Sequence, residues 1–338
     1  MRVDMLFVTG HPLRILAPVY LGQGSWKMKI DRQKALTAFE EYTKKYDVTD
    51  EKVKLKIDHT YRVCALCEQI AAQSGFDEDE IELSWLTGLL HDVGRFEQLR
   101  QYGTFIDAQS IDHAEFGADI LFKEGKIRDY VEDASEDELL EKAVRCHSAY
   151  RVPGDYTPRE KKFADLLRDA DKIDILKVNV IVPIEEIYNV TTYDLKHCKV
   201  TEEVMQAFYE EHCILRSLKR TPVDNVVGHI SLVYELVYPV SCQIVHEQGY
   251  LDKLMNFHSE LPETEEQFAR IREKMNRYLG DKMTQVSYIM KDRSRAAYTL
   301  FSSLKKAEER AEREGWIDAD DLEKELGIAA IQVEQDKI

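Results

Sequence analysis

Proline is scarce in this chain. It occurs 8 times in 338 residues, and none lies between Pro18 and Pro153. Because proline removes a backbone donor and ends or kinks a helix, such a stretch favours long helices. The sequence also lacks an Asn-Gly turn between alternating apolar and polar residues, shows no convincing strand set and contains no internal repeat. The predicted fold class is therefore all-α.

Cysteine is equally sparse, with six residues scattered along the chain. A chain of this length needs no disulfide framework, so a reducing, cytoplasmic location is expected. Cys64 and Cys67 form a Cys-x-x-Cys pair, but no second pair follows at zinc-finger spacing and the pair lies in a helical pattern. We interpret both as half-buried thiols rather than as a redox or zinc site.

Basic residues do not match the acidic ones: 46 Lys and Arg stand against 63 Asp and Glu, a net charge of −17. A protein that grips nucleic-acid backbone needs a clustered basic surface, so a nucleic-acid polymer is not an expected partner. A small phosphorylated substrate stays compatible, because a bound divalent cation can reverse the local field. The first 27 residues hold no apolar run that could span a bilayer, and no membrane partner is expected.

Helical periodicity begins at Asp31. Asp50 and Asp77 can cap two helices, and Gly75 can end the first of them. Pro262 followed by Thr264-Glu-Glu-Gln267 has the pattern of a capping box. Segments 94–111 and 149–158 are interpreted as loops. The expected helices cover residues 31–46, 50–74, 77–92, 112–124, 136–148, 159–176, 200–218, 224–247, 263–279 and 291–313.

Four of these helices direct a residue with metal-binding chemistry toward the core. The apolar stripe of the second helix carries His59 together with Leu55, Val63, Leu66 and Ile70. Similar spacing turns His113, His147 and Asp171 inward. The adjacent pair His91-Asp92 ends a very apolar run, and polar groups delivered into a core must find partners or coordinate an ion.

Each of these residues alone has an ordinary explanation. A single histidine on an apolar face is more often a core or interface residue, and a buried aspartate is more often a cap or an ion-pair partner. The whole set is different, because unpaired buried charges are costly. Four imidazoles and two carboxylates facing one core suit one or two divalent ions, drawn from Fe, Mn, Zn, Co, Ni and Mg. The other histidines are given structural roles: His11, His197, His212, His229, His246 and His258.

The pattern resembles the H…HD…D signature of the HD superfamily of metal-dependent phosphohydrolases. The matching residues are His59, the run Leu89-Leu90-His91-Asp92-Val93-Gly94-Arg95 and the run Asp169-Ala170-Asp171-Lys172-Ile173-Asp174. They span about residues 50–180. The inserted histidines resemble a six-ligand binuclear subset, which implies the metal ligands His59, His91, Asp92, His113, His147 and Asp171.

The family context also selects among three aspartates. Asp171 is preferred because the family ligand is the first Asp of an Ala-Asp-x-x-Asp context, whereas spacing alone leaves Asp174 open. The pattern along the chain divides it into a leader or over-extended N-terminus (1–30), an HD-type metal-dependent hydrolase domain (31–220) that contains the resemblance, and a helical C-terminal extension packed on the core (221–338). The boundary near 219–223 follows the break at Lys219-Arg220-Thr221-Pro222.

Two departures from relatives narrow the activity. Phe96-Glu97-Gln98 stands where cyclic-di-GMP phosphodiesterases carry a GYP motif, and Ser148 stands where they have a second adjacent histidine, so that class is not expected. Arg95 stands at the position where many relatives have a lysine, three residues after the Asp of the His-Asp pair. We interpret Arg95 as a catalytic group that holds a substrate phosphate bidentately, with Lys172 as a second candidate.

The implied function is a phosphohydrolase or phosphodiesterase that uses a metal-activated water on a nucleotide or another small phosphate ester. One metal would be held by His59, His91 and Asp171, and a second by His113 and His147, with Asp92 bridging and taking part in catalysis. The alternatives are a mixed-valent di-iron oxygenase with the same six ligands and a ligand-sensing module without turnover.

Other catalytic classes find no support. The sequence has neither a Gly-rich phosphate loop nor a Ser-His-Asp elbow, so P-loop nucleotide hydrolysis and covalent serine catalysis have no support. Substrate identity and oligomeric state are left open. Four aromatic residues of the predicted loops can stack a base or pack locally: Tyr102, Phe105, Tyr150 and Tyr156.

Overall fold

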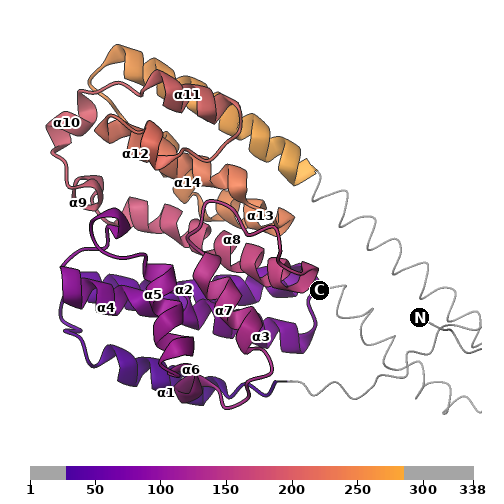
Figure 1. Ribbon diagram of the computed structural model, residues 1–338. Helices are drawn as coiled ribbons and strands as arrows, with labels where there is room; N and C mark the ends of the chain where they lie inside the picture. The colour runs from indigo at the N-terminus through magenta and orange to yellow at the C-terminus, as the bar shows by residue number, and fades with distance from the viewer. Residues whose placement is uncertain (1–27, 285–338) are drawn as a thin grey trace, which may run out of the picture.

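The computed structural model describes residues 28–284, and within them it contains helices and loops but no strand (Figure 1). The predicted all-α class is confirmed. The proposed leader and the helix predicted at 291–313 lie outside the described residues, apart from residues 28–30. None of the described helices combines the length and hydropathy that crossing a bilayer requires.

One layer of helices comes from the first half of the described chain. Helix α2 packs against α3, and α5 packs between α4 and α7. A π-helical segment, Asp119–Lys123, continues α5 directly. The helices of this layer are α1 (Arg32–Thr43), α2 (Glu51–Gln73), α3 (Glu78–Leu90), α4 (Val93–Tyr102), α5 (His113–Ala118), α6 (Ile127–Tyr130) and α7 (Asp137–Cys146).

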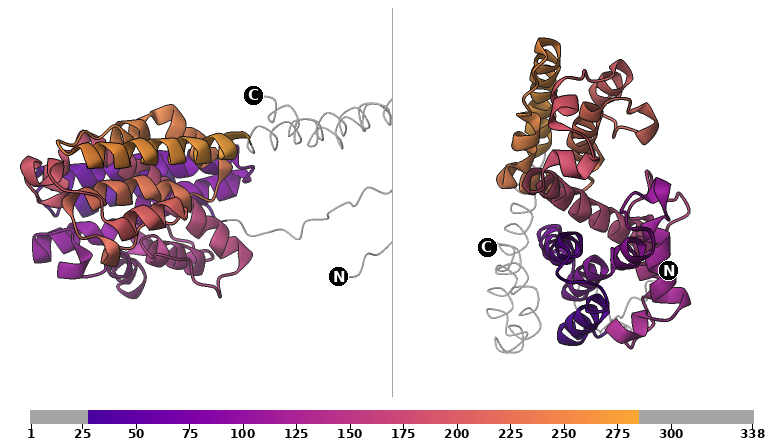
Figure 2. Two further views of the ribbon diagram at one scale, coloured as in Figure 1. Left: turned by 90° about the horizontal axis from the view of Figure 1, so that it is seen from above. Right: turned by 90° about the vertical axis from the view of Figure 1, so that its left-hand side faces the viewer.

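Helix α8 (Pro158–Ile181) lies between this layer and a second one, as the views in Figure 2 show. It contacts α2, α3 and α7 on one side and α12, α13 and α14 on the other. Asp169 fastens the two layers together: its carboxylate accepts the backbone N–H of Val237 at 3.0 Å and of Tyr238 at 2.8 Å. The second layer contains α9 (Ile184–Tyr188), α10 (Thr192–Lys196), α11 (Glu202–Tyr209), α12 (Pro222–Ile230), α13 (Pro239–Gln248), α14 (Tyr250–Met255) and helical residues 262–284.

Side-chain caps explain where the helices around the site begin. Asp50 accepts the backbone N–H of Lys52 at the start of α2, and Asp77 forms a capping box with Glu80 at the start of α3. Gly75, after the end of α2, has φ 77°. The predicted starts of α2 and α3 and the stop at Gly75 are confirmed.

Four sequence predictions about the fold are wrong. Residues 93–102 form α4 rather than a loop, because Gly94 lies inside a helix instead of ending one. The helix predicted over 200–218 ends at Tyr209 and is followed by a loop with a 3-10 turn. The helix predicted over 224–247 is interrupted by a 3-10 segment, Ser231–Glu235, and restarts at Pro239. Thr264 does not cap a helix, because its hydroxyl donates to Cys198 O while Gln267 bonds Val200.

The Cys-x-x-Cys pair needs one correction. Cys64 and Cys67 are fully buried, at 3% and 0% exposure, rather than half-buried. Both thiols are free, and burial raises the pKa of each. A buried thiol with a raised pKa is neither a ready nucleophile nor a ready metal ligand, so their role is packing between α2 and α3.

Candidate metal centre

The six side chains predicted as metal ligands come together from five places in the fold. His59 lies on α2, His113 begins α5, and Asp171 lies on α8. His91 and Asp92 join α3 to α4, and His147 follows α7. The four histidines and Asp92 are each at most 4% exposed, whereas the Asp171 side chain is 14% exposed. The cluster is therefore buried and opens to solvent beside Asp171.

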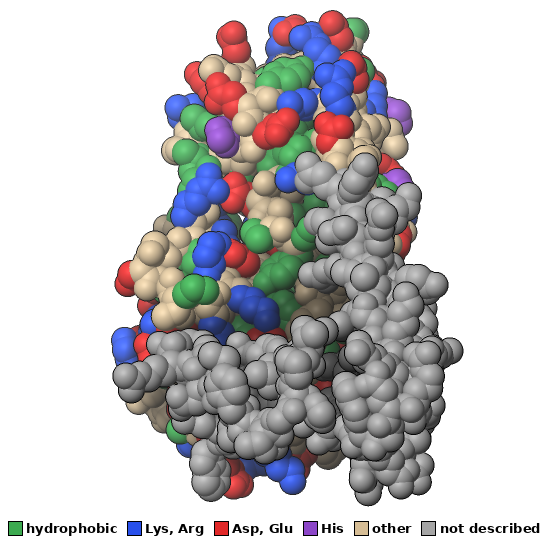
Figure 3. Space-filling model, turned by 90° about the vertical axis from the view of Figure 1, so that its right-hand side faces the viewer, with side chains coloured by type: hydrophobic (Ala, Val, Ile, Leu, Met, Phe, Trp, Pro, Cys, Tyr) green, Lys and Arg blue, Asp and Glu red, His purple; other side chains and the backbone are tan. Residues whose placement is uncertain are grey.

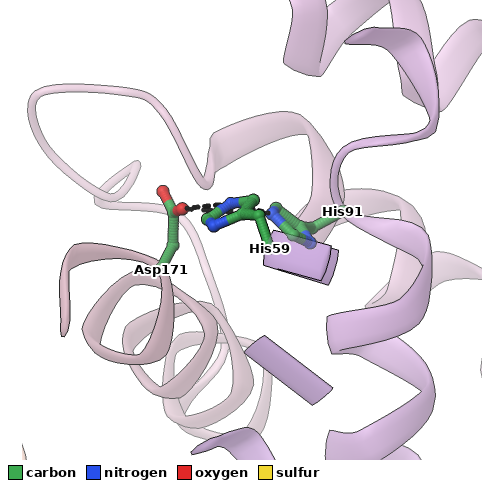
Figure 4. Close-up of side chains that lie close together, drawn as sticks. All are labelled: His59, His91 and Asp171. Carbon is green, nitrogen blue, oxygen red and sulfur yellow. Dashed lines mark hydrogen bonds and ion pairs between the residues drawn. The ribbon is translucent and has the colours of Figure 1, made fainter. Parts of the chain in front are cut away.

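The imidazoles form two pairs. The Nε2 atoms of His59 and His91 are 3.2 Å apart, and those of His113 and His147 are 3.0 Å apart. Asp171 belongs to the first pair, because its Oδ1 lies 3.2 Å from His59 Nε2 and 3.9 Å from His91 Nε2 (Figure 4). All four histidines thus turn the same ring nitrogen toward the cluster.

Asp92 connects the two pairs. Its Oδ2 lies 3.5 Å from the Nε2 atoms of both His59 and His91. Its Oδ1 lies 3.5 Å from His113 Nε2 and 3.7 Å from His147 Nε2. One carboxylate therefore offers a separate oxygen to each pair, which is the geometry of a bridging ligand.

The other nitrogen of every imidazole is already engaged. Asp174 Oδ2 lies 2.6 Å from His59 Nδ1, and Asp107 Oδ2 lies 2.8 Å from His113 Nδ1. Backbone carbonyls accept from the remaining two rings: Gly88 O from His91 Nδ1 and Val144 O from His147 Nδ1, both at 2.7 Å. Such partners fix the tautomer and orient Nε2 for a metal, so the donor set fits one or two transition-metal ions.

Comparison with known protein families agrees with this geometry. Residues 57–176 match the family described as HD domain, and this span contains all six residues. This segment is an HD domain. Searches among curated proteins and among solved structures gave no match. HD domains are mostly metal-dependent hydrolases, and the described residues include His and Asp groups that could hold a metal.

Two close backbone crossings position the ligands of the HD domain. A Cβ on Gly88 would lie 2.9 Å from the Cα of Cys64, so glycine lets α3 approach α2 one turn before His91. A Cβ on Gly94 would lie 2.3 Å from His113 O and 2.6 Å from Gly117 N. Glycine at 94 therefore brings the start of α5, with His113, against the residues that follow Asp92.

The protonation states of His91, His113 and Asp92 suit metal ligands. At His59, burial and the charge of Lys56 act to lower the pKa, but the carboxylates of Asp171 and Asp174 raise it above its ordinary value. Burial lowers the pKa of His91 to about 3 and of His113 to about 4, which keeps both rings neutral at physiological pH. Burial alone would raise the pKa of Asp92, but the charge of Lys56 and the neighbouring imidazoles hold it well below its usual range. Neutral imidazoles beside an ionised carboxylate are the ligand forms that bind divalent cations.

Two cations flank Asp92. Lys56 Nζ lies 2.7 Å from Asp92 Oδ2, and Arg95 Nε lies 3.6 Å from Asp92 Oδ1. The Nη1 of Arg95 already donates to Gln98, to the Phe105 carbonyl and to Asp107. Arg95 therefore lies at the centre. Within the described residues its Nε and Nη2 atoms have no hydrogen-bond acceptor, so this edge of the guanidinium is left for an acceptor of a ligand.

Lys172 is placed differently. It is 9% exposed, and its Nζ has no hydrogen-bond partner in residues 28–284. Burial lowers its pKa, and the nearby charge of Arg168 lowers it further. No hydrogen bond joins Lys172 to the six clustered residues, although it follows Asp171 directly on α8.

Three residues of the HD domain site were missed by the sequence analysis or given another role. Lys56 precedes His59 by three positions and so lies on the same face of α2, a signal the apolar stripe obscured. Asp107 lies in a segment interpreted as a loop. Asp174, considered as a ligand, instead orients His59 and accepts from Arg62 at 2.6 Å. Asp112 lies near Asp107 and His113 but caps α5, so it adds no separate site.

The four aromatic residues considered for base stacking also differ in placement. Phe105 lies between the cations of the site, with its ring centroid 5.7 Å from Lys56 Nζ and 5.8 Å from the Arg95 guanidinium. Tyr156 donates to Lys142 O and packs locally. Tyr102 and Tyr150 are more than 40% exposed, which leaves their rings accessible.

Proposed function

We propose that this protein is a metal-dependent phosphohydrolase or phosphodiesterase acting on a nucleotide or another small phosphate ester. The observation that carries the proposal is Asp92, whose two oxygens each face one histidine pair. A shared carboxylate between two sets of nitrogen ligands suits two neighbouring cations, the arrangement used to activate water against phosphorus. HD domains as a group are metal-dependent phosphohydrolases, which supports the same class.

The residues that would hold the ions follow from the distances. His59, His91 and Asp171 would bind one ion and His113 and His147 the other, with Asp92 bound to both. Divalent cations there would lower the pKa of a bound water and polarise a phosphoryl group. The donor set accepts Fe, Mn, Zn, Co or Ni. It suits Mg less well, because Mg prefers oxygen ligands to nitrogen ligands.

The cations beside Asp92 favour an anionic substrate. Lys56 is 18% exposed and Arg95 is 14% exposed, so both reach the partly open side of the centre. Ammonium and guanidinium groups there can bind phosphoryl oxygens and stabilise charge that develops on them. Phe105 lies against both cations and shields them from water, which strengthens those contacts. A di-iron oxygenase has the same ligands but does not need these two cations.

The surface supports a small substrate. The part of the face in Figure 3 that is not grey shows acidic and basic side chains interspersed rather than one continuous basic surface. Together with the net charge of −17, this favours a small phosphate ester over a nucleic-acid polymer.

The six free cysteines support the proposed cytoplasmic location.

Metal analysis combined with a substrate screen tests the proposal. Protein purified without oxygen is analysed for bound metals and incubated with nucleotides and with bis(p-nitrophenyl) phosphate. We expect bound transition metal and phosphate-ester hydrolysis in the wild type, and neither in His91→Ala. Oxygen consumption by the reduced protein without ester hydrolysis would favour the oxygenase, and full turnover by His91→Ala would contradict both.

A further inference from the structure

Arg168 is a buried cation of the HD domain that, within residues 28–284, forms its hydrogen bonds with backbone carbonyls. It lies on α8, one turn before Asp171, and is 6% exposed. Asp165, one turn earlier on α8, pairs with Lys161 instead. The guanidinium donates to carbonyl oxygens at the end of α7 and just beyond it, those of Cys146 (3.0 Å), His147 (3.3 Å), Ala149 and Tyr150 (3.4 Å). Arg168 therefore connects α8 to the main chain that follows α7.

The end of α7 needs such a partner. The last carbonyls of a helix have no intrahelical donor, and a left-handed glycine commonly helps to satisfy them. Helix α7 ends at Cys146 without one, because the next residue, His147, keeps a right-handed helical conformation with φ −61°. A buried guanidinium provides several donors in one plane, and its charge is favourable at the negative end of the helix dipole. Arg168 thus caps α7 at the position of His147.

His147 is consequently held at both ends of the residue. Its ring is fixed to the last turn of α7, because Nδ1 donates to Val144 O at 2.7 Å. Its main chain is fixed to α8, because its carbonyl oxygen accepts from Arg168. Between these contacts its Nε2 lies 3.0 Å from His113 Nε2 and 3.7 Å from Asp92 Oδ1.

The other imidazoles of the centre are oriented without Arg168. Asp174 and Asp107 hold the rings of His59 and His113, and a backbone carbonyl holds the ring of His91. In the assignment given above, the second ion would be held by His113, His147 and Asp92. Without His147 it would keep one imidazole and the shared carboxylate, whereas the ligands of the first ion would all stay in place.

We propose that Arg168 is a positioning residue for the second ion, because it holds His147 where one cation can bind it together with His113 and Asp92. This role rests on the two ions of the proposed function, but not on the reaction that they support. Since Arg168 precedes Asp171 by one turn of α8, it also fixes the end of α7 relative to the helix that would hold the first ion. Loss of the guanidinium should therefore empty the second position and leave the first occupied.

A helix cap without this role would not produce that pattern. Arg272 donates to Met255 O at 2.9 Å, and Met255 is the last residue of α14 in the second layer. It makes the same kind of contact at a helix end that carries none of the six clustered residues. Removal of either arginine should lower the free energy of unfolding, but only removal of Arg168 should change the amount of bound metal.

Titration of the full chain with Mn²⁺ tests this role. Chelator-treated protein is titrated by calorimetry, and the loaded protein is studied by electron paramagnetic resonance, in which two Mn²⁺ ions that share a carboxylate give a spin-coupled spectrum. We expect two sites and a coupled spectrum in the wild type. In Arg168→Met we expect the spectrum of an isolated ion and a second site weakened by roughly ten- to a hundredfold, the loss that removal of a ligand-orienting group causes.

Three further variants separate position from charge and from folding. Arg168→Lys keeps the charge, but an ammonium cannot span the carbonyls that a planar guanidinium reaches together, so its second site should be weaker than in the wild type and tighter than in Arg168→Met. Arg272→Met should bind both ions like the wild type. His147→Ala supplies the spectrum of a chain that lacks the ligand itself. If Arg168→Met fails to fold by circular dichroism, Arg168→Lys carries the test.

The outcomes separate this role from the proposed function. Two coupled ions of wild-type affinity in folded Arg168→Met, or in Arg168→Lys where only that variant folds, would overturn the role and leave the hydrolase. Equal weakening of both ions, or a single ion in the wild type, would overturn it as well. Selective loss of the second ion, with no ester hydrolysis by the loaded wild type, would refute the hydrolase and leave the role of Arg168. A wild type that binds no ion would overturn both.

Discussion

The two groups of cations in this molecule differ in how their charge is balanced. In the HD domain, Lys56 bonds Asp92 and Arg95 bonds Asp107, so each cation has a carboxylate of the chain itself. Between α11 and α12, Arg216 and Lys219 form no ion pair within the described part of the chain, although the charge of the buried Asp224 acts on Lys219. The first group is held by ion pairs with carboxylates of the chain, whereas Lys219 of the second group is held by packing against Gly228 of α12.

This difference decides which measurements are informative. Each group of the metal centre is oriented by another residue, so a substitution there changes metal affinity directly. The charges of Lys219 and Arg216 help to lower the pKa of the buried His229, so a substitution there acts on the response to pH. Four predictions test the contrast.

The largest effect is expected for Asp92→Ala. It removes the carboxylate that faces both histidine pairs and leaves Lys56 without its ion-pair partner, so we expect loss of bound metal and of hydrolysis. Elemental analysis and a turnover assay measure the two losses. A folded Asp92→Ala protein that keeps metal and activity would remove Asp92 from the centre.

Metal removal and return should change stability. A cation that binds only the folded chain raises the free energy of unfolding by about 2.7 kcal/mol when its free concentration is a hundred times the dissociation constant. Urea denaturation with and without Mn²⁺ measures the change, and His91→Ala should show none. An equal gain in that variant would place the stabilising metal elsewhere.

Asp174→Asn should weaken metal binding by roughly ten- to a hundredfold, because the carboxylate that orients His59 Nδ1 is replaced by a neutral amide. Competition with a chelating dye gives the affinity. Arg62→Ala is the matched control: it removes a partner of Asp174 and keeps the contact with His59, so a smaller change is expected. Equal losses in both variants would mean that charge in the region, not orientation of the ring, controls affinity.

The smallest effect concerns pH. His229 takes up a proton near pH 6.5 in the unfolded chain but only near pH 3 in the folded one. Between these values the unfolded state binds more protons, so the free energy of unfolding falls as the pH falls, by about 1 kcal/mol per unit. Denaturation curves from pH 6 to pH 4 should show a shallower dependence in His229→Gln than in the wild type. Identical slopes would mean that His229 is protonated in the folded protein.

Local signals made α2 and α3 predictable. Asp50, Asp77 and Gly75 act on neighbouring residues, so their effect can be read without knowing the fold. Helix α4 was missed because Gly94 looks like a helix stop in isolation. Its role is a close approach to Gly117, and that contact joins residues 23 positions apart.

The metal-ligand side chains could be predicted from the sequence, but the residues that surround and orient them could not. Apolar periodicity shows that His59 and Asp171 face inward, whichever partner they meet. The partners of the imidazoles depend on tertiary contacts: Asp174 meets His59 across 115 positions, and Lys56 meets Asp92 across 36. Sequence spacing alone could not tell that Asp174 orients a ring while Asp169 fastens the second layer to α8.

The crossing at Gly94 and Gly117 has a consequence for how this centre can change. Because backbone meets backbone there, the separation between Asp92 and His113 is set without any intervening side chain. Apolar residues elsewhere in the core can vary in size while that separation stays constant. A single methyl group at position 94, by contrast, would push α5 outward and move His113 away from the Asp92 carboxylate.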